Sequence, residues 1–597
     1  MKKTIIALVF FVLLQIQALG LFAAYLEKAP VTVKQPDGTT LKLYATGDEY
    51  YNWLCDEDGY TVVINPQTKY YCYAKLKDNE LVASTSIVGK SNPQRAGLKP
   101  NINLPVAKIN EIKKNAYDYM HVNDVQKSTP SRTLSKATTN VEPPFHKINN
   151  IVIYIRFADQ AEFTTTQSYY TSIFNGFNSS SSCLRNYFKE ASYGKLEINT
   201  SFYPTNNGTN VISYQDIYES GYYLPIQNSA IGYSSESERT DREQSLLSRA
   251  INSVKSQIPT TIDLDNNNDG KVDNICFIVR GGNSSWNTLL WPHKWCLYTR
   301  NVYINGKKVH EYNFQIEDFL SDNNVGVLCH EMNHTLGAPD LYHYYDVNYG
   351  TPIGNWCLMA NDLNPPQHIC AYVKYRYDRW IPEIQEITTS GTYSLNPLTS
   401  STNNCYKIAI KNSSEYLVLE YRRKTGLYEN RIYGSGLVIY RVNESYTGNA
   451  GGSGFGGGND MIYVFRPNGS LNNDGNISSS FLSAQSGRDS FSNTTNPHCF
   501  ISNGNNGNIY IKNIKESNGK VTFDVRFCDG VDIVKSNTNN LPELTNASNS
   551  ISTQNTVVVK NTDNVIFEAA NHVTINSGFE VKLGGEFTIT MNGCGEK

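Results

Sequence analysis

The segment HEMNH at residues 330–334 places two histidines four residues apart, with a glutamate directly after the first. On a helix, positions i and i+4 lie on one face, so His330 and His334 can direct two imidazoles at one metal ion. This spacing is typical of a zinc (Zn2+) site. Glu331 would then lie beside the ion as general base, taking a proton from an activated water and passing it to a leaving amine.

A third protein ligand is expected from the chain that follows the helix, because catalytic zinc sites usually have three. Gly337 comes three residues after His334 and can adopt a positive φ, which would end the helix and turn the chain back. Asp340 and His343 both come within reach after such a turn. From the residues alone, either of them can complete the zinc site.

The longer segment HEMNHTLGAPDLY (330–342) resembles the signature of the immune inhibitor A type of secreted zinc metallopeptidases. The similarity extends in order from about residue 150 to 527 and includes NYFKEASYGKLEI (186–198) and GNWCLMAND (354–362). It implies a secreted, zinc-dependent endopeptidase that is made as a zymogen and has a metzincin-like catalytic domain. Met359 would be the apolar floor beneath the metal.

The resemblance also bears on the third ligand. Asp340 stands six residues after His334, which is the spacing at which metzincins place their third zinc ligand. His343 occupies a position where family members usually carry an acid, and an imidazole there can also bind zinc. We expect Asp340 to be the ligand, with His343 holding a nearby hydrogen bond.

The segment DLDNNNDGKVD (263–273) contains a second group of oxygen ligands. Asp265, Asn267, Asp269 and Asp273 fit positions 1, 3, 5 and 9 of a calcium loop. Position 12 is Cys276, so the usual bidentate glutamate is missing. The two interpretations are a bound Ca2+ ion and a structural turn rich in Asp and Asn.

The N-terminus has the layout of a signal peptide, which we assign to residues 1–24. Two lysines precede an apolar run from Ile5 to Leu14. A membrane anchor is the alternative, but Gln15 and Gln17 interrupt the run before it reaches the ~20 residues that a membrane span needs. We therefore expect an exported, secreted or extracellular protein with no transmembrane span in its mature form.

Residues 25–130 alternate short strand patterns with turn signals, and a polar linker continues to about residue 147. The linker holds Arg132 and Lys136, as a protease-sensitive tether would. A β-rich unit on such a tether predicts a prosegment that covers the catalytic cleft.

Cys55 and Cys72 lie in this β-rich unit and leave two questions open. They could pair as a disulfide or remain buried thiols. As thiolates they could also block the zinc. No cysteine-switch motif of the family surrounds either one, so steric cover is the preferred latency mechanism.

The rest of the chain predicts a multidomain protein. Mixed helix and strand patterns indicate an α/β metallopeptidase domain at 148–385, and short strand patterns indicate a β-sandwich-like domain at 386–528. The glycine-rich stretch 448–460 within it is expected to be a flexible loop. Residues 531–555 are polar and predict a linker. Residues 556–597 contain repeated short β runs that resemble a three-coathanger stack domain.

Composition and motifs narrow the function classes. A net charge of -3 gives no overall reason to bind nucleic acid. The leading hypothesis is an endopeptidase that hydrolyses proteins, and a peptidase restricted to small peptides stays open. The rival is an exported surface-binding or adhesion protein with an inactive peptidase scaffold, whose C-terminal β domains contact glycans or cell surfaces. Intact His330, Glu331, His334 and Met359 argue against an inactive site.

Overall fold

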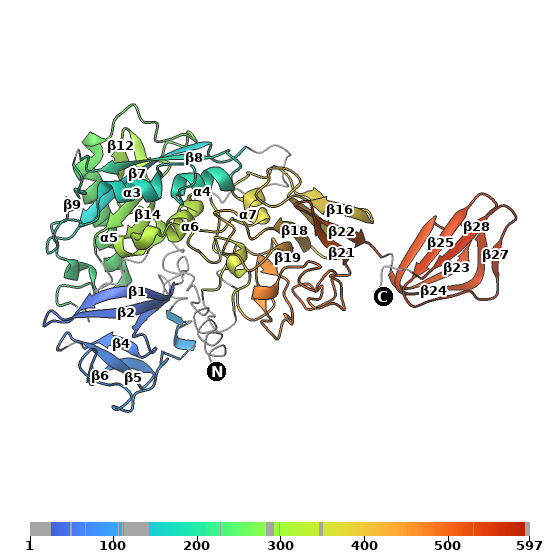
Figure 1. Ribbon diagram of the computed structural model, residues 1–597, viewed down its shortest axis with the longest axis horizontal. Coiled ribbons are helices and arrows are strands. Elements are labelled where there is room, and N and C mark those ends of the chain that lie inside the picture. The colour runs from blue at the N-terminus through green and yellow to red at the C-terminus, as the bar shows by residue number, and fades with distance from the viewer. Residues whose placement is uncertain are drawn as a thin grey trace, which may run out of the picture.

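The protein is described by a computed structural model. It is multidomain and strand-rich, with several sheets and few helices (Figure 1). The expected signal peptide and most of the expected linker lie outside the described residues. The described ranges are 26–47, 51–65, 67–105, 107–109, 111–112, 142–206, 208–226, 229–281, 292–297, 299–344, 350–449, 452–528 and 530–591.

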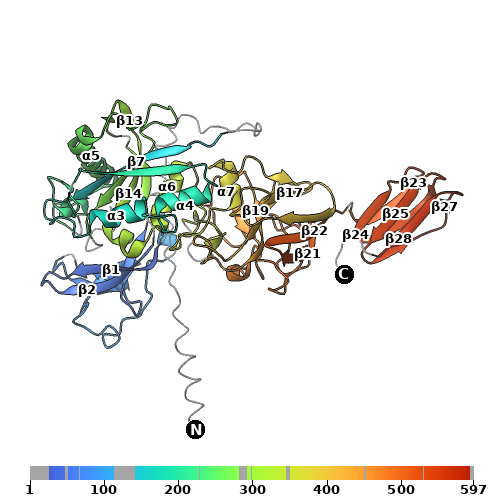
Figure 2. The same ribbon diagram turned by 45° about the horizontal axis from the view of Figure 1, so that its top comes forward.

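The N-terminal unit is one antiparallel sheet whose strands follow each other in chain order. Its buried residues, such as Val33, Leu43 and Val62, belong to the same apolar cluster as Ile151 and Phe277 of the next unit. The sheet therefore packs against that unit, as Figures 1 and 2 also show. Its strands are β1 (Leu26–Lys34), β2 (Thr40–Gly47), β3 (Asn52–Cys55), β4 (Thr61–Ile64), β5 (Tyr71–Lys77) and β6 (Glu80–Ile87).

The central unit is built on a mainly parallel sheet with the order β11-β14-β10-β7-β8, and β9 also pairs with β7. Strand β11 is antiparallel to β14 and forms one end of this order. A separate hairpin joins β12 and β13. The strands are β7 (Lys147–Arg156), β8 (Glu197–Tyr203), β9 (Tyr214–Gln215), β10 (Ile275–Val279), β11 (His293–Cys296), β12 (Val302–Ile304), β13 (Lys307–Val309) and β14 (Glu311–Ile316).

Helices cover both faces of the central sheet. Leu246 and Ile251 of α5 share a cluster with one face, whereas α3, α4 and α6 share a cluster with the other, through residues such as Tyr170, Tyr187 and Met332. Because both faces are covered, strand β10 is fully buried. The helices are α3 (Gln167–Phe174), α4 (Leu184–Ala191), α5 (Glu236–Val254), α6 (Gly326–Thr335) and α7 (Ala371–Arg376), with short 3-10 turns η1 (Ser220–Tyr223), η2 (Lys255–Gln257), η3 (Glu317–Asn323) and η4 (Gly354–Trp356).

The next unit consists of a five-stranded sheet, β15-β17-β18-β19-β20, and a three-stranded sheet, β16-β22-β21. Leu419 and Phe523 lie in the core between them. The other face of the larger sheet, including Val418 and Val438, shares its cluster with α4 and α6, so this unit also braces the central one. The strands are β15 (Gln385–Glu386), β16 (Gly391–Leu395), β17 (Cys405–Ala409), β18 (Tyr416–Arg422), β19 (Gly436–Val442), β20 (Ile462–Val464), β21 (Tyr510–Ser517) and β22 (Lys520–Arg526), with a 3-10 turn η5 (Ile477–Ser479).

The C-terminal unit stands apart from the others in both views and consists of parallel strands (Figures 1 and 2). The prediction of a linker at 531–555 is wrong, because this segment forms β23 and most of β24. Most of its residues are polar, and some of these, such as Thr545 and Thr553, are buried beside Ala547 and Ile551, which supply part of a small apolar core. The strands are β23 (Gly530–Thr538), β24 (Leu544–Val559), β25 (Asn564–Ala569), β26 (His572–Thr574), β27 (Phe579–Val581) and β28 (Glu586–Thr590).

No helix in the described ranges is long and apolar enough to span a membrane.

Candidate metal centre

Helix α6 carries His330 and His334, and a backbone carbonyl fixes each imidazole. Nδ1 of His330 lies 3.0 Å from the carbonyl oxygen of Leu358, and Nδ1 of His334 lies 2.7 Å from that of Ala338. A carbonyl only accepts hydrogen bonds, so Nδ1 of each ring carries the proton. In the neutral rings, Nε2 is then left with its lone pair available for a metal.

The turn after α6 delivers Asp340 to the same place. The helix ends at Thr335, and Gly337 has a φ of +97°, a conformation that favours glycine. The chain reverses there as the sequence predicted, so that the backbone of Ala338 meets His334. On the far side of the turn, the backbone N–H of Leu341 donates to the carbonyl of Met359 at 2.8 Å.

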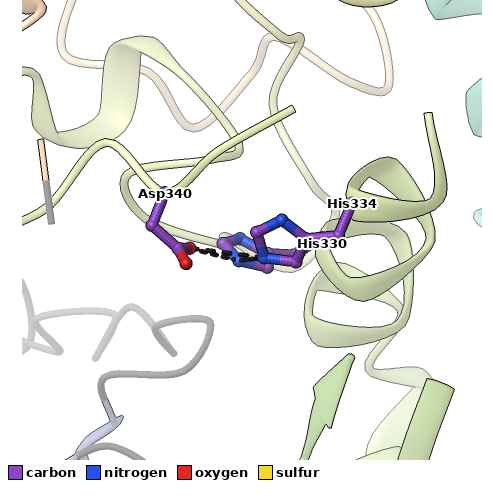
Figure 3. Close-up of side chains that lie close together, drawn as sticks. All are labelled: His330, His334 and Asp340. Atoms are coloured by element: carbon purple, nitrogen blue, oxygen red, sulfur yellow. Dashed lines mark hydrogen bonds and ion pairs between the residues drawn. The ribbon is translucent and has the colours of Figure 1, made fainter. Parts of the chain in front are cut away.

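Three side chains converge at this point (Figure 3). Nε2 of His330 lies 3.0 Å from Nε2 of His334 and 3.0 Å from Oδ1 of Asp340, and Nε2 of His334 lies 3.4 Å from the same oxygen. Because zinc holds its ligands at about 2.0–2.2 Å, three atoms sharing one ion must lie within about 4 Å of one another. These atoms meet that condition. Within the described ranges, no other group of three or more His, Cys, Asp or Glu donors converges in this way.

The charges at this point call for a cation. Two imidazole lone pairs directed at each other and at a carboxylate repel unless a proton or metal ion lies between them. Burial opposes the charge on His334, but neighbouring Asp340 outweighs it and raises the pKa of His334 to about 9. Burial likewise opposes ionisation of Asp340, yet the two histidines hold the pKa of this carboxyl well below its usual range. The donor set of two imidazoles and one carboxylate suits zinc.

Glu331 lies beside this cluster and is 1% exposed. Burial raises the pKa of its carboxyl, and the two histidines partly counteract that effect. Its Oε1 atom has no hydrogen-bond partner among the described residues. A buried carboxylate oxygen without a partner is costly for the fold, so such an atom often marks a functional site.

Met359 is fully buried in the apolar cluster behind α6. The loop that carries it also supplies two backbone carbonyls, from Leu358 to His330 and from Met359 to Leu341. This loop therefore fixes both the helix and the turn that bring the three donor side chains together.

His343 does not join the cluster. Its Nε2 lies 2.7 Å from Oδ1 of Asp460, in the unit formed by β15–β22, and both side chains are buried. The hydroxyl of Tyr344 instead donates to Oδ2 of Asp340, the oxygen that does not face the histidines. The structure thus brings Asp340 together with the two histidines and places His343 in a separate hydrogen bond with Asp460.

The proposed calcium ligands form an internally bonded turn. Asp265 accepts backbone hydrogen bonds from Asp269 and Gly270 at 2.8 and 3.0 Å, and its Oδ2 lies 2.6 Å from Nζ of Lys307. Asp273 accepts from the backbone of Asn266. The side chain of Asn267 accepts from the backbone of Asp269. These contacts are those of a turn rich in Asp and Asn, and calcium binding stays a prediction.

Several contacts of the site could not be read from the motif. Asn449, Asp460 and Gly452 come from the glycine-rich stretch that was expected to be a flexible loop, of which residues 450 and 451 lie outside the described ranges. Gly448, Asn449, Gly452 and Asp460 of this stretch contact residues 339–343, which follow α6. The sequence around Asn449, an Asn among glycines, is typical of many surface loops. The contact of Asn449 with the turn after α6 therefore becomes visible only in the fold.

Comparison with known proteins points to the same region. The model of the immune inhibitor A peptidase M6 catalytic domain family matches residues 265–363. Immune inhibitor A of Bacillus thuringiensis subsp. alesti is 29% identical over 110 residues, which are 16% of this chain and 16% of that protein. The matched family segment contains all three converging donors and Glu331.

Two solved structures of OgpA from Akkermansia muciniphila are also similar in part. The wild-type structure is 11% identical, with a TM-score of 0.23, and covers 54% of this chain and 90% of that one. The inactive variant, in complex with an O-glycopeptide substrate, is 12% identical, with a TM-score of 0.22, and covers 53% and 85%. At these scores the likeness carries no argument about function.

Proposed function

We propose that this protein is a secreted zinc metalloendopeptidase that hydrolyses peptide bonds in proteins and is made as a zymogen. The observation that supports it most is the convergence of His330, His334 and Asp340 beside the buried Glu331. The segment that holds them matches a peptidase family model, which favours the peptidase over an adhesion protein with an inactive scaffold.

In this mechanism His330, His334 and Asp340 would hold the zinc, and His343 would fix the chain after Asp340 through its hydrogen bond with Asp460. When bound, zinc supplies Lewis acidity that activates water and polarises the peptide carbonyl. Glu331 takes a proton from the attacking water and transfers it to the nitrogen of the leaving amine. Its burial suits this role, because a raised pKa brings a carboxyl closer to the pH at which it must both accept and release a proton.

The test is digestion of denatured casein by the purified protein after removal of its N-terminal unit. We expect internal cleavage, seen as intermediate fragments on a gel before small peptides accumulate. Cleavage of short peptides without any action on casein would limit the activity to small substrates. A protein that cleaves neither would support the adhesion alternative.

Latency is the second part of the proposal. The N-terminal sheet packs its apolar residues against the central unit, and the sequence predicts a cleavable tether after it. Steric cover is favoured over a thiolate, because burial raises the pKa of Cys72 and so disfavours its thiolate form. Cys55 is also buried, and the two are not joined to each other in a disulfide.

We expect the chain that begins near Tyr25 to be nearly inactive and limited proteolysis between the two units to raise its activity. The measurement is the rate of casein cleavage before and after digestion, with the cut site read by N-terminal sequencing. Exchanging both Arg132 and Lys136 for glutamine is the matched control if a trypsin-like protease is used. Full activity in the uncut chain would contradict this latency mechanism.

Export through residues 1–24, a metzincin-like layout, and Met359 as the apolar floor are further parts of this proposal. Surface or glycan contacts through the C-terminal β units and Ca2+ binding by Asp265, Asn267, Asp269 and Asp273 are carried as secondary hypotheses.

A further inference from the structure

The glycine-rich stretch between β19 and β20 lies directly against the turn that carries Asp340. A Cβ atom on Gly448 would lie 2.7 Å from the carbonyl oxygen of Asp340 and 2.9 Å from Cβ of Pro339. A Cβ atom on Gly452 would lie 1.9 Å from Oδ1 of Asp460 and 2.8 Å from the ring of His343. Glycine is therefore required at both positions for the two segments to approach so closely.

Asn449 lies between these glycines and is fully buried. Its backbone N–H donates to the carbonyl of Asp340 at 2.9 Å. Its side-chain Nδ2 donates to the carbonyls of Leu341 at 3.1 Å and Ile462 at 2.8 Å, and its Oδ1 accepts from the N–H of Ile462 at 3.0 Å. One amide group thus ties the turn of the donor aspartate to strand β20.

These contacts complete a clamp around Asp340. On one side, the N–H of Leu341 donates to the carbonyl of Met359, and on the other, Asn449 binds the carbonyls of both Asp340 and Leu341. The peptide groups that follow Asp340 are therefore fixed from two separate units of the fold. A metal ligand must be held to within a fraction of an ångström, and that precision comes from residues outside the first layer of ligands.

We propose that Asn449 is a positioning residue for zinc, through which the unit of β15–β22 sets the affinity of the metal centre. The inference rests on the proposed function, since it assumes that Asp340 binds zinc. It assigns the glycine-rich stretch a role in the site although no atom of Asn449 belongs to the donor set. It also makes the unit of β15–β22 part of the metal centre. Separating this unit from the central unit should therefore weaken zinc binding.

The matched control is Asn404, a second buried asparagine of the same unit. It is 4% exposed, and its Nδ2 donates to the hydroxyl of Tyr193 at 2.9 Å and to the carbonyl of Ser400. Both Asn449→Ala and Asn404→Ala remove buried hydrogen bonds, so both should lower the melting temperature of the metal-free protein. Only Asn449→Ala removes a side-chain hydrogen bond to the turn of Asp340, the one from Nδ2 to the carbonyl of Leu341, while its backbone bond to Asp340 is kept.

The measurement is the zinc Kd by competition with a chromogenic chelator, with kcat and KM then determined at saturating zinc. We expect Asn449→Ala to weaken zinc binding about 10- to 100-fold, the usual effect of losing an outer-shell partner, and Asn404→Ala to leave it unchanged. At saturating zinc, Asn449→Ala should lower kcat more than it changes KM. Asn449→Ser keeps a small polar side chain and is measured as well, with an intermediate loss expected, in case the alanine variant does not fold.

Equal zinc affinity in wild type and the Asn449 variants would overturn the inference, as would an equal loss in Asn404→Ala. Failure of the proposed function itself would be seen separately, because the wild-type protein would then bind no zinc, and this inference would fall with it.

Discussion

Replacing Glu331 by glutamine is expected to lower kcat for protein cleavage by about 10²- to 10⁴-fold, the range typical of losing a general base. Glutamine has the same shape but cannot take the proton from water. The fold should be kept, because Oε1 of Glu331 makes no hydrogen bond among the described residues that glutamine would lose. The measurement is kcat on casein or a cleaved peptide derived from it.

The control for this variant is its zinc content. Glu331 is not among the three converging donors, so Glu331→Gln should bind zinc with the same stoichiometry as wild type. Loss of zinc in the variant would mean that Glu331 acts in metal binding instead. Wild-type kcat in a zinc-loaded variant would show that the proposed proton transfer is wrong.

The second large effect is expected at Asp340. Asp340→Ala removes the carboxylate that lies 3.0 and 3.4 Å from the two imidazole nitrogens and leaves them one protein donor short. Zinc binding should weaken by more than the roughly 10- to 100-fold seen for outer-shell residues, and activity should fall with it. The measurement is bound zinc by atomic absorption after dialysis against a fixed free-zinc buffer.

His343 provides the matched comparison. It is in the same turn region but bonds Asp460 rather than the donor cluster. His343→Ala should therefore destabilise the fold, since leaving a buried hydrogen-bonding group such as Asp460 without this partner costs about 1–3 kcal/mol, while zinc is retained. His343→Gln places an amide near the position of Nε2, can donate to Asp460, and serves if the alanine variant does not fold. Zinc retained in Asp340→Ala but lost in the His343 variants would reverse the ligand assignment.

The local part of the site could be predicted from the sequence because it depends on helix geometry and one turn. The spacing of His330 and His334 places both on one face of α6, and Gly337 supplies the positive φ that reverses the chain. Asp340 follows within a few residues of that reversal, so few positions could reach the histidines. The residues alone do not decide whether Asp340 or His343 is the third zinc ligand.

The non-local part could not be predicted in this way. Asn449 and Asp460 lie more than a hundred residues after the helix, and their approach depends on how the sheet of β15–β20 packs on the central unit. The polar composition of the segment 531–555 predicts a linker, but the segment forms strands. In a short parallel stack only a few inward positions, such as Ala547 and Ile551, need to be apolar, so composition is a poor guide there.

The central claim is that the convergence of His330, His334 and Asp340 forms a zinc site that drives protein cleavage. The most direct measurement is a zinc titration of the chelator-stripped protein, freed of its N-terminal unit, with bound zinc and casein cleavage followed in the same samples. We predict no cleavage in the stripped protein and full recovery when one zinc ion is bound per chain. Cleavage that persists without metal, or a protein that binds one zinc ion and still cleaves nothing, would contradict the account.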